Sequence, residues 1–219
     1  MREMFQQELH EVQDRLVEIA ENVLAVVDDA TQAFCTTDVK RADQALASAD
    51  AISEKALALD ELVIRVLARQ SPVARDLRIL VSALRMSNSL ERMGSLASHV
   101  AAIARYRYPA SAVPDALEDT FDEMSRLCVR LARKTVKVLK NTDVDLARKI
   151  QAEDERVDEL HRHVFDVVLG DKWAENAVYT VDVTLASRYL ERFADHVVDI
   201  SSKVSYLTTG DWSETDIDD

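Results

Sequence analysis

The sequence of 219 residues contains few residues that interrupt helices, with only 3 glycines and 3 prolines. A protein made mainly of β-strands needs a turn about every eight to twelve residues, and Gly and Pro supply many of these turns. Aromatic residues are also scarce, at 5%, whereas hydrophobic residues as a whole account for 47%. Because residue types that favour helices dominate the rest of the chain, the composition predicts an all-α fold with a sizeable core.

Cysteine is nearly absent as well. The two cysteines, Cys35 and Cys128, lie far apart and form no Cys-x-x-Cys pair, which argues against a zinc site and against a disulfide scaffold. The first residues contain no apolar signal-peptide core, and no apolar run approaches the roughly 20 residues that span a bilayer. We therefore expect a soluble cytoplasmic protein.

Basic residues are fewer than acidic ones, with 27 Lys and Arg residues against 40 Asp and Glu residues, which gives a net charge of −13. This charge argues against a nucleic-acid partner. The segment from Arg65 to Arg107 is an exception, with eight arginines and only two acidic residues. Such a face could contact an acidic protein or a phosphate, although a solvated helix surface is the alternative. The candidate partner-binding residues are Arg69, Arg75, Arg78, Arg85 and Arg92.

The few interrupting signals fall at regular intervals along the chain. Asp38 and Asp143 are suited to cap helix starts, Pro72 and Gly170 mark breaks, and a short linker lies between the prolines at 109 and 114. These signals predict six long helices, near residues 3–35, 38–69, 73–106, 115–140, 143–169 and 175–207.

The two halves of the chain repeat each other. The stretch 37–39, Thr-Asp-Val, recurs 105 residues later, and the stretch 90–92, Leu-Glu-Arg, recurs 100 residues later. Long helices with apolar residues three and four apart pack as bundles. We expect two tandem three-helix bundles, residues 1–108 and 115–207, followed by a disordered acidic tail, residues 208–219.

Acidic residues four positions apart form two series in the second half. Asp154 and Asp158 make one pair, and Glu191, Asp195 and Asp199 make a second series. Residues at this spacing lie one above another on a helix, so like charges repel unless a cation offsets them. Carboxylate oxygens suit Mg²⁺, Mn²⁺, Ca²⁺ or iron, and the helical positions predict a surface site. The alternative is a solvated acidic face.

Signatures of catalysis are missing. The chain has no Glu-x-x-His motif of di-iron bundles, no glycine-rich phosphate loop and no nucleophile elbow. The sequence therefore predicts a protein that is not an enzyme. Two alternatives stay open, a metal-dependent phosphate-ester hydrolase that uses the four carboxylates at 154, 158, 191 and 195, and a helical scaffold without a signalling role.

The tandem halves, the segment Arg-Gln-Ser-Pro-Val-Ala-Arg-Asp-Leu-Arg at 69–78 and the repeated Leu-Glu-Arg stretch resemble the PhoU family. The likeness covers about residues 3–207. It implies a bacterial regulator that restrains phosphate uptake and the phosphate-starvation response. Such a protein would contact the ATPase of a Pst-type phosphate transporter and a sensor histidine kinase, and reach the membrane only through these partners.

The resemblance also implies (Glu/Asp)-x-x-x-Asp pairs that can carry iron or another metal, without requiring a cofactor. The second half keeps both pairs. The corresponding positions of the first half hold Ala49, Ser53 and Ser95, and only Glu91 remains acidic. We therefore expect metal in the second half or nowhere. Long amphipathic helices with spare apolar surface further predict a homodimer.

Overall fold

The computed structural model describes residues 2–209 and contains no strand in that range, which confirms the all-α prediction. The elements are α1 (Arg2–Thr36), α2 (Val39–Gln70), α3 (Ala74–Arg107), the short 3₁₀ turn η1 (Asp115–Leu117), α4 (Glu118–Asn141), α5 (Val144–Arg148), α6 (Gln151–Val168) and α7 (Ala177–Thr209). Of the predicted tail, residues 208–219, the first two belong to α7, and residues 210–219 lie outside the described residues. No helix in the described range is both long enough and apolar enough to cross a membrane.

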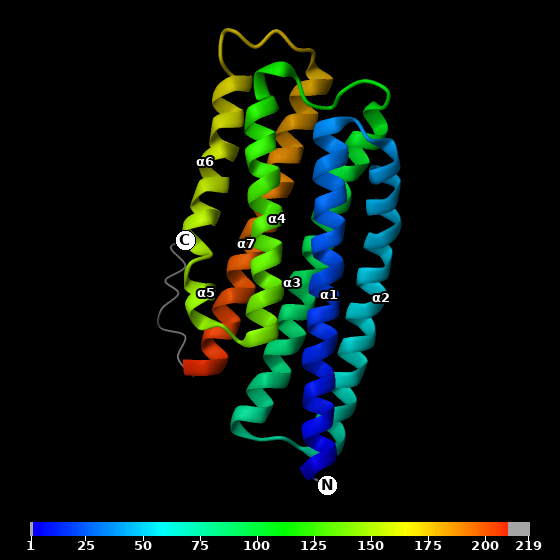
Figure 1. Ribbon diagram of the computed structural model, residues 1–219, viewed down its shortest axis with the longest axis vertical. Helices are drawn as coiled ribbons and strands as arrows, with labels where there is room; N and C mark the ends of the chain where they lie inside the picture. The colour runs from blue at the N-terminus through cyan, green and yellow to red at the C-terminus, as the bar shows by residue number, and fades with distance from the viewer. Residues whose placement is uncertain (1, 210–219) are drawn as a thin grey trace.

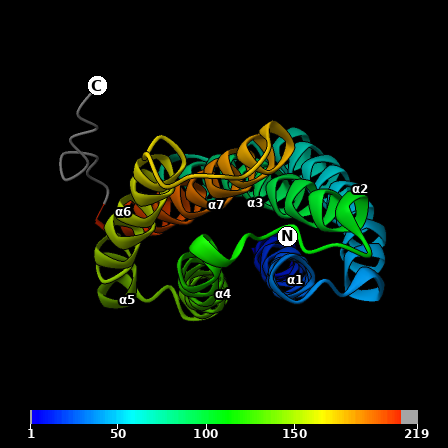
Figure 2. The same ribbon diagram turned by 90° about the horizontal axis from the view of Figure 1, so that it is seen from above.

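The helices run side by side along the long axis of the molecule (Figure 1). Helices α1, α2 and α3 all contact one another as the first three-helix bundle, and α4, α6 and α7 do the same as the second. Viewed from above, α6, α7, α3 and α2 follow one another in a curved layer, beside which α4 and α1 form a second layer (Figure 2). The bundles meet where α3 contacts α7 and where α1 contacts α4.

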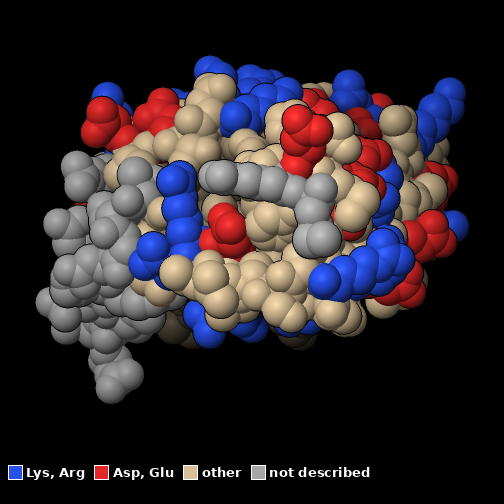
Figure 3. Space-filling model, turned by 90° about the horizontal axis from the view of Figure 1, so that it is seen from below, with Lys and Arg blue, Asp and Glu red and all other residues tan. Residues whose placement is uncertain are grey.

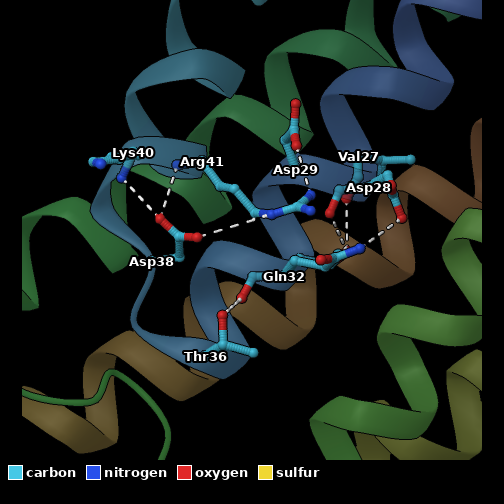
Figure 4. A network of polar contacts seen from close by, with 9 residues as sticks. Val27, Asp28, Asp29, Gln32, Thr36, Asp38, Lys40 and Arg41 are labelled. Carbon is cyan, nitrogen blue, oxygen red and sulfur yellow. Dashed lines mark hydrogen bonds and ion pairs between the residues drawn. The ribbon is translucent and has the colours of Figure 1, made fainter.

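Both predicted caps are confirmed. The Asp38 side chain accepts hydrogen bonds from the backbone N–H groups of Lys40 and Arg41, at 3.0 and 3.2 Å. The Asp143 side chain accepts one from the N–H of Leu146, at 2.9 Å. Figure 4 shows the first cap, where Arg41 also reaches across to Asp29 of α1 at 2.8 Å. A capping side chain satisfies backbone donors that have no partner within the helix, so these residues fix where α2 and α5 begin.

The predicted helix over 143–169 is interrupted, which the sequence did not indicate. Backbone N–H groups of Lys149 and Ile150 bond to the carbonyls three residues back, Leu146 and Ala147, each at 3.2 Å. This tighter 3₁₀-like winding separates α5 from α6. Because neither Gly nor Pro lies at the break, no residue type marked it.

The sequence repeat corresponds to equivalent buried positions. Ile52 and Val157, which the repeat relates, both have no exposed surface, and the same holds for Val100 and Ile200. These positions of the repeat are therefore core positions, which the two bundles share.

The central helices α3 and α7 also place equivalent positions against each other. Ser89 of α3 donates a hydrogen bond to Asp199 of α7, with 2.5 Å between Oγ and Oδ2. At the offset of 100, Ser89 corresponds to Tyr189 and Asp199 corresponds to His99. The rings of Tyr189 and His99 also lie against each other, with 5.0 Å between their centroids. The repeat therefore relates two contacts between α3 and α7. One is a hydrogen bond, and the other is a packing of two rings.

A charged pair joins the same two helices near the end of α3. Arg107 donates two hydrogen bonds to Asp182 of α7, the longer at 3.2 Å. The side chain of Asp182 is only 9% exposed, and Arg107 is its ion-pair partner. By contrast, Arg105 pairs with Asp43 of α2 at 2.5 Å, and both of these side chains are more than half exposed.

We expect Arg107→Met to lower the free energy of unfolding by about 2–3 kcal/mol, because the buried carboxylate of Asp182 would lose its partner. Arg105→Met, the matched control on the same helix, should cost less than about 1 kcal/mol, since its pair is solvated. Urea unfolding followed by circular dichroism measures both variants. Equal losses would show that the two bundles do not depend on the Arg107 contact.

Candidate metal centre between α6 and α7

The acidic residues of the second half face each other across α6 and α7. On α6, Val157 and Leu160 point into the core, which places the neighbouring Asp158 at the edge of the helix toward α7. On α7, Glu191 and Asp195 are one turn apart and so share a face. One oxygen from each of Asp158, Glu191 and Asp195 lies within 4.8 Å of the other two. This spacing allows one cation to contact all three carboxylates.

The fourth carboxylate, Asp154, lies one turn before Asp158 on α6. Its pKa is raised to about 7, chiefly by burial and then by the negative charges of Asp158, Asp195 and Glu191. Burial, followed by the neighbouring carboxylates, also raises the pKa of Glu191 and of Asp195. These shifts show that all four carboxylates belong to one electrostatic cluster, which we call the carboxylate cluster.

The carboxylate cluster has too few donors of its own. Arg188 donates a hydrogen bond to Glu191, and its charge opposes the rise of that pKa. Buried oxygens of Asp154, Asp158 and Glu191 nevertheless have no hydrogen-bond partner among the described residues. A buried oxygen without a donor costs about 1–3 kcal/mol. A divalent cation or iron, for which carboxylate oxygens are suitable ligands, would satisfy these atoms, so the residues present fit a metal.

Exposure differs among the members of the carboxylate cluster. The side chain of Glu191 is only 13% exposed, because α6 packs against α7, whereas Asp195 is exposed. The sequence-based expectation of a surface site therefore stays a prediction. The surroundings of Glu191 have a lower dielectric than the surface, which strengthens both the repulsion and the attraction for a cation.

Asp199, the fifth predicted ligand, lies outside the carboxylate cluster. It accepts hydrogen bonds from Ser89 and Lys203 instead. The reason is geometric, because each residue advances about 100° around an α-helix, and the eight positions from Glu191 to Asp199 turn the side chain about 80°. That rotation points Asp199 away from α6 and toward α3. The prediction treated the series as a straight ladder.

The first bundle has a carboxylate that the sequence analysis missed. Asp60 of α2 has a buried oxygen without a hydrogen-bond partner, and burial raises its pKa, with a further contribution from Glu91. Asp60 lies seven residues, or two turns, after Ser53, the position that corresponds to Asp158. The repeat gave no signal for it, because the corresponding position of the second half holds Phe165.

The predicted partner-binding arginines do not form one patch. Arg69 lies 4.0 Å from Glu8 of α1. Arg75 and Arg78 line a cavity of about 740 Å³ between α1, α3, α4 and α7. Figure 3 shows this end of the molecule, where Lys and Arg side chains are mixed with acidic and other side chains. Arg85 lines a separate groove between α3 and α7. Arg92 is exposed on α3.

In protein stripped of metal, stability should fall as the pH rises from about 4 to about 7, because Asp154 holds a proton in the folded state at a pH where the unfolded state has lost it. We expect Asp154→Asn to raise the free energy of unfolding by about 1–2 kcal/mol at pH 8, after allowance for solvent screening. The gain should vanish near pH 4.

Urea unfolding in a chelator at several pH values measures this dependence. The control is Asp50→Asn, because Asp50 is an exposed carboxylate on α2. If the free energy of unfolding depends on pH in the same way in both variants, repulsion within the carboxylate cluster does not destabilise the folded protein.

The chain resembles known proteins along nearly its whole length. A family model described as the PhoU domain matches residues 16–104 and 121–204. The phosphate-specific transport system accessory protein PhoU homolog 2 of Mycobacterium tuberculosis is 39% identical, over 96% of this chain and 99% of that protein. PhoU homolog 1 of Mycobacterium leprae is 37% identical, over 99% and 97%.

Solved structures agree in fold. PhoU from Pseudomonas aeruginosa superposes with a TM-score of 0.84 at 27% identity, covering 94% of this chain and all of that chain. The phosphate transport system regulatory protein PhoU from Streptococcus pneumoniae gives 0.85 at 23% identity, covering 96% of this chain. Since the family model matches both helical halves and the mycobacterial relatives align from end to end, the chain belongs to the PhoU family.

Proposed function

We propose that this protein is a negative regulator of phosphate uptake and of the phosphate-starvation response. It would act in the cytoplasm by contact with the ATPase of a phosphate ABC transporter and with a sensor histidine kinase. The observation that carries the proposal is the 39% identity, over nearly the full length of both chains, to a phosphate-specific transport system accessory protein. The finer claims, repression and the two partners, rest on the resemblance of the sequence to the family.

The carboxylate cluster supports a regulatory role better than a catalytic one. Its members are carboxylates held between two helices, and the nearby His161 is hydrogen-bonded to Ser187 at 2.9 Å. A bound metal would supply positive charge that links α6 to α7. Asp154, Asp158, Glu191 and Asp195 would hold it, and their unpartnered oxygens support this assignment.

We also propose that two copies associate. Val178, Val181 and Leu185 are exposed large apolar side chains three and four residues apart, along one side of α7. Such a stripe suits a helix-to-helix contact between identical subunits. Sedimentation of the purified protein distinguishes a dimer from a monomer.

The metal assignment predicts that protein purified without chelator contains a divalent metal or iron, and that Glu191→Gln combined with Asp195→Asn loses it. The double variant removes two of the three carboxylates that lie within reach of one ion. Elemental analysis measures the content. The matched control, Asp60→Asn with Glu91→Gln, removes the same charge from the first bundle and should keep the metal. Metal that stays with the first double variant would place the site elsewhere.

The regulatory proposal predicts that deleting the gene raises alkaline phosphatase activity in cells grown with abundant phosphate, because repression would be lost. Plasmid-borne wild-type protein should restore repression. Phosphate uptake, measured in the same strains, should rise on deletion. If the response stays off and uptake is unchanged in the deletion strain, the protein is not the repressor.

A further inference from the structure

A groove of about 600 Å³ lies between α3 and α7, beside the carboxylate cluster. From α3 it is lined by Arg85, Asn88 and Ser89, and from α7 chiefly by Arg192, His196 and Lys203. Most of these side chains carry positive charge or N–H groups. They come from two elements that are far apart in the sequence and in contact in the fold. We call this feature the α3–α7 groove.

The α3–α7 groove brings three cationic side chains together in a strongly negative protein. The chain carries a net charge of −13, yet three permanent cations line the groove, against two carboxylates, Asp195 and Asp199. Asp199 is already compensated, since it accepts hydrogen bonds from Lys203 and Ser89. Arg192 is exposed and forms no salt bridge with any described residue. With Lys203 paired to Asp199, Arg192 is the cation through which the groove can attract an anion.

Lys203 is part of the built wall of this groove. It is a lysine with only 8% of its surface exposed, and it lies at the crossing of the two helices. Burying an ammonium group is costly unless negative charge faces it. Asp199 supplies one such charge from the same helix, and its Ser89 hydrogen bond fixes the carboxylate in place. The ammonium group of Lys203 is thus held at the groove by Asp199 of α7, which is itself held by Ser89 of α3.

Nearby cations also act on His196. Burial lowers the pKa of this imidazole, Asp199 opposes that shift, and Arg192, Arg92 and Lys203 lower it further. An anion placed in the groove would be attracted by Arg85 and Arg192, while the charge of Lys203 is shared with Asp199.

The donors match one class of ligand. Guanidinium groups bind tetrahedral oxyanions through paired N–H groups, and a lysine ammonium adds a point charge. Arg85 and Arg192 stand on opposite walls, so that they can approach one anion from two sides. We propose that the α3–α7 groove binds inorganic phosphate. The choice of phosphate among the oxyanions rests on the proposed function, whereas the anion site itself rests on the groove.

Asp195 sets a limit on this binding and gives the proposal a sharp test. Its carboxylate lines the groove and also belongs to the carboxylate cluster. It repels an anion in the groove, so removing its charge should strengthen phosphate binding while removing Arg192 should weaken it. A general effect of surface charge would not depend on where in the fold the charge was removed.

The experiment is calorimetric titration of the full chain with inorganic phosphate at pH 7, in chelator and at fixed ionic strength. We expect saturable binding with a Kd below about 1 mM. Arg192→Gln should weaken binding at least about tenfold. Arg105→Gln removes the same charge from α3 outside the groove and should stay within about twofold, while Asp195→Asn should tighten binding about threefold or more.

Three results would overturn the proposal: no binding at about 10 mM phosphate, an equal loss in Arg105→Gln and Arg192→Gln, or weaker binding in Asp195→Asn. Equal affinity for sulfate would overturn the assignment to phosphate. Circular dichroism checks that each variant is folded, and Arg85→Gln probes the opposite wall if Arg192→Gln is not. The gene deletion tests regulation by a separate readout, so either proposal can fail while the other stands.

Discussion

The contact between α3 and α7 is the constraint on which the arrangement of the whole molecule depends. Each helix is the last of its own bundle, and each belongs to the core of that bundle through residues such as Leu90 and Leu190. One face of each helix is therefore buried within its own bundle. The remaining face must match the other helix, and the repeat places equivalent residues there. What distinguishes the halves is which side chains occupy these equivalent positions.

The fold can hold the carboxylate cluster in one half alone because the energetic cost of the cluster is local. Four carboxylates between packed helices repel each other, and without a cation this repulsion works against folding. The apolar residues beneath them, among them Val157 and Phe193, are fully buried and hold α6 against α7 regardless of the cluster. The first half keeps the same core with Ala49, Ser53 and Ser95 at the acidic positions, so the fold does not require the acids.

Sequence patterns predicted the features that depend on residue type at a single position. They missed features that depend on how side-chain directions change over several turns of a helix. Capping by Asp38 and Asp143 follows from residue type and position, and the structure has both. The four-residue spacing of Glu191 and Asp195 also located the cluster. Asp199 was misplaced because a spacing of four drifts around the helix with each repetition. The break before α6 could not be anticipated, since it arises in the hydrogen bonding of residues that are all compatible with a helix.

The carboxylate cluster and the α3–α7 groove are not independent, because Asp195 belongs to both. A cation among the carboxylates would cancel the charge with which Asp195 repels an anion in the α3–α7 groove. Thermodynamic linkage then requires the converse, that an anion in the groove strengthens the hold of the carboxylates on the cation. Since one feature joins α7 to α6 and the other joins α7 to α3, occupation of both would fix the position of α7 within its layer. In the regulator proposed above, a change in phosphate would thus act on the contact between the two bundles.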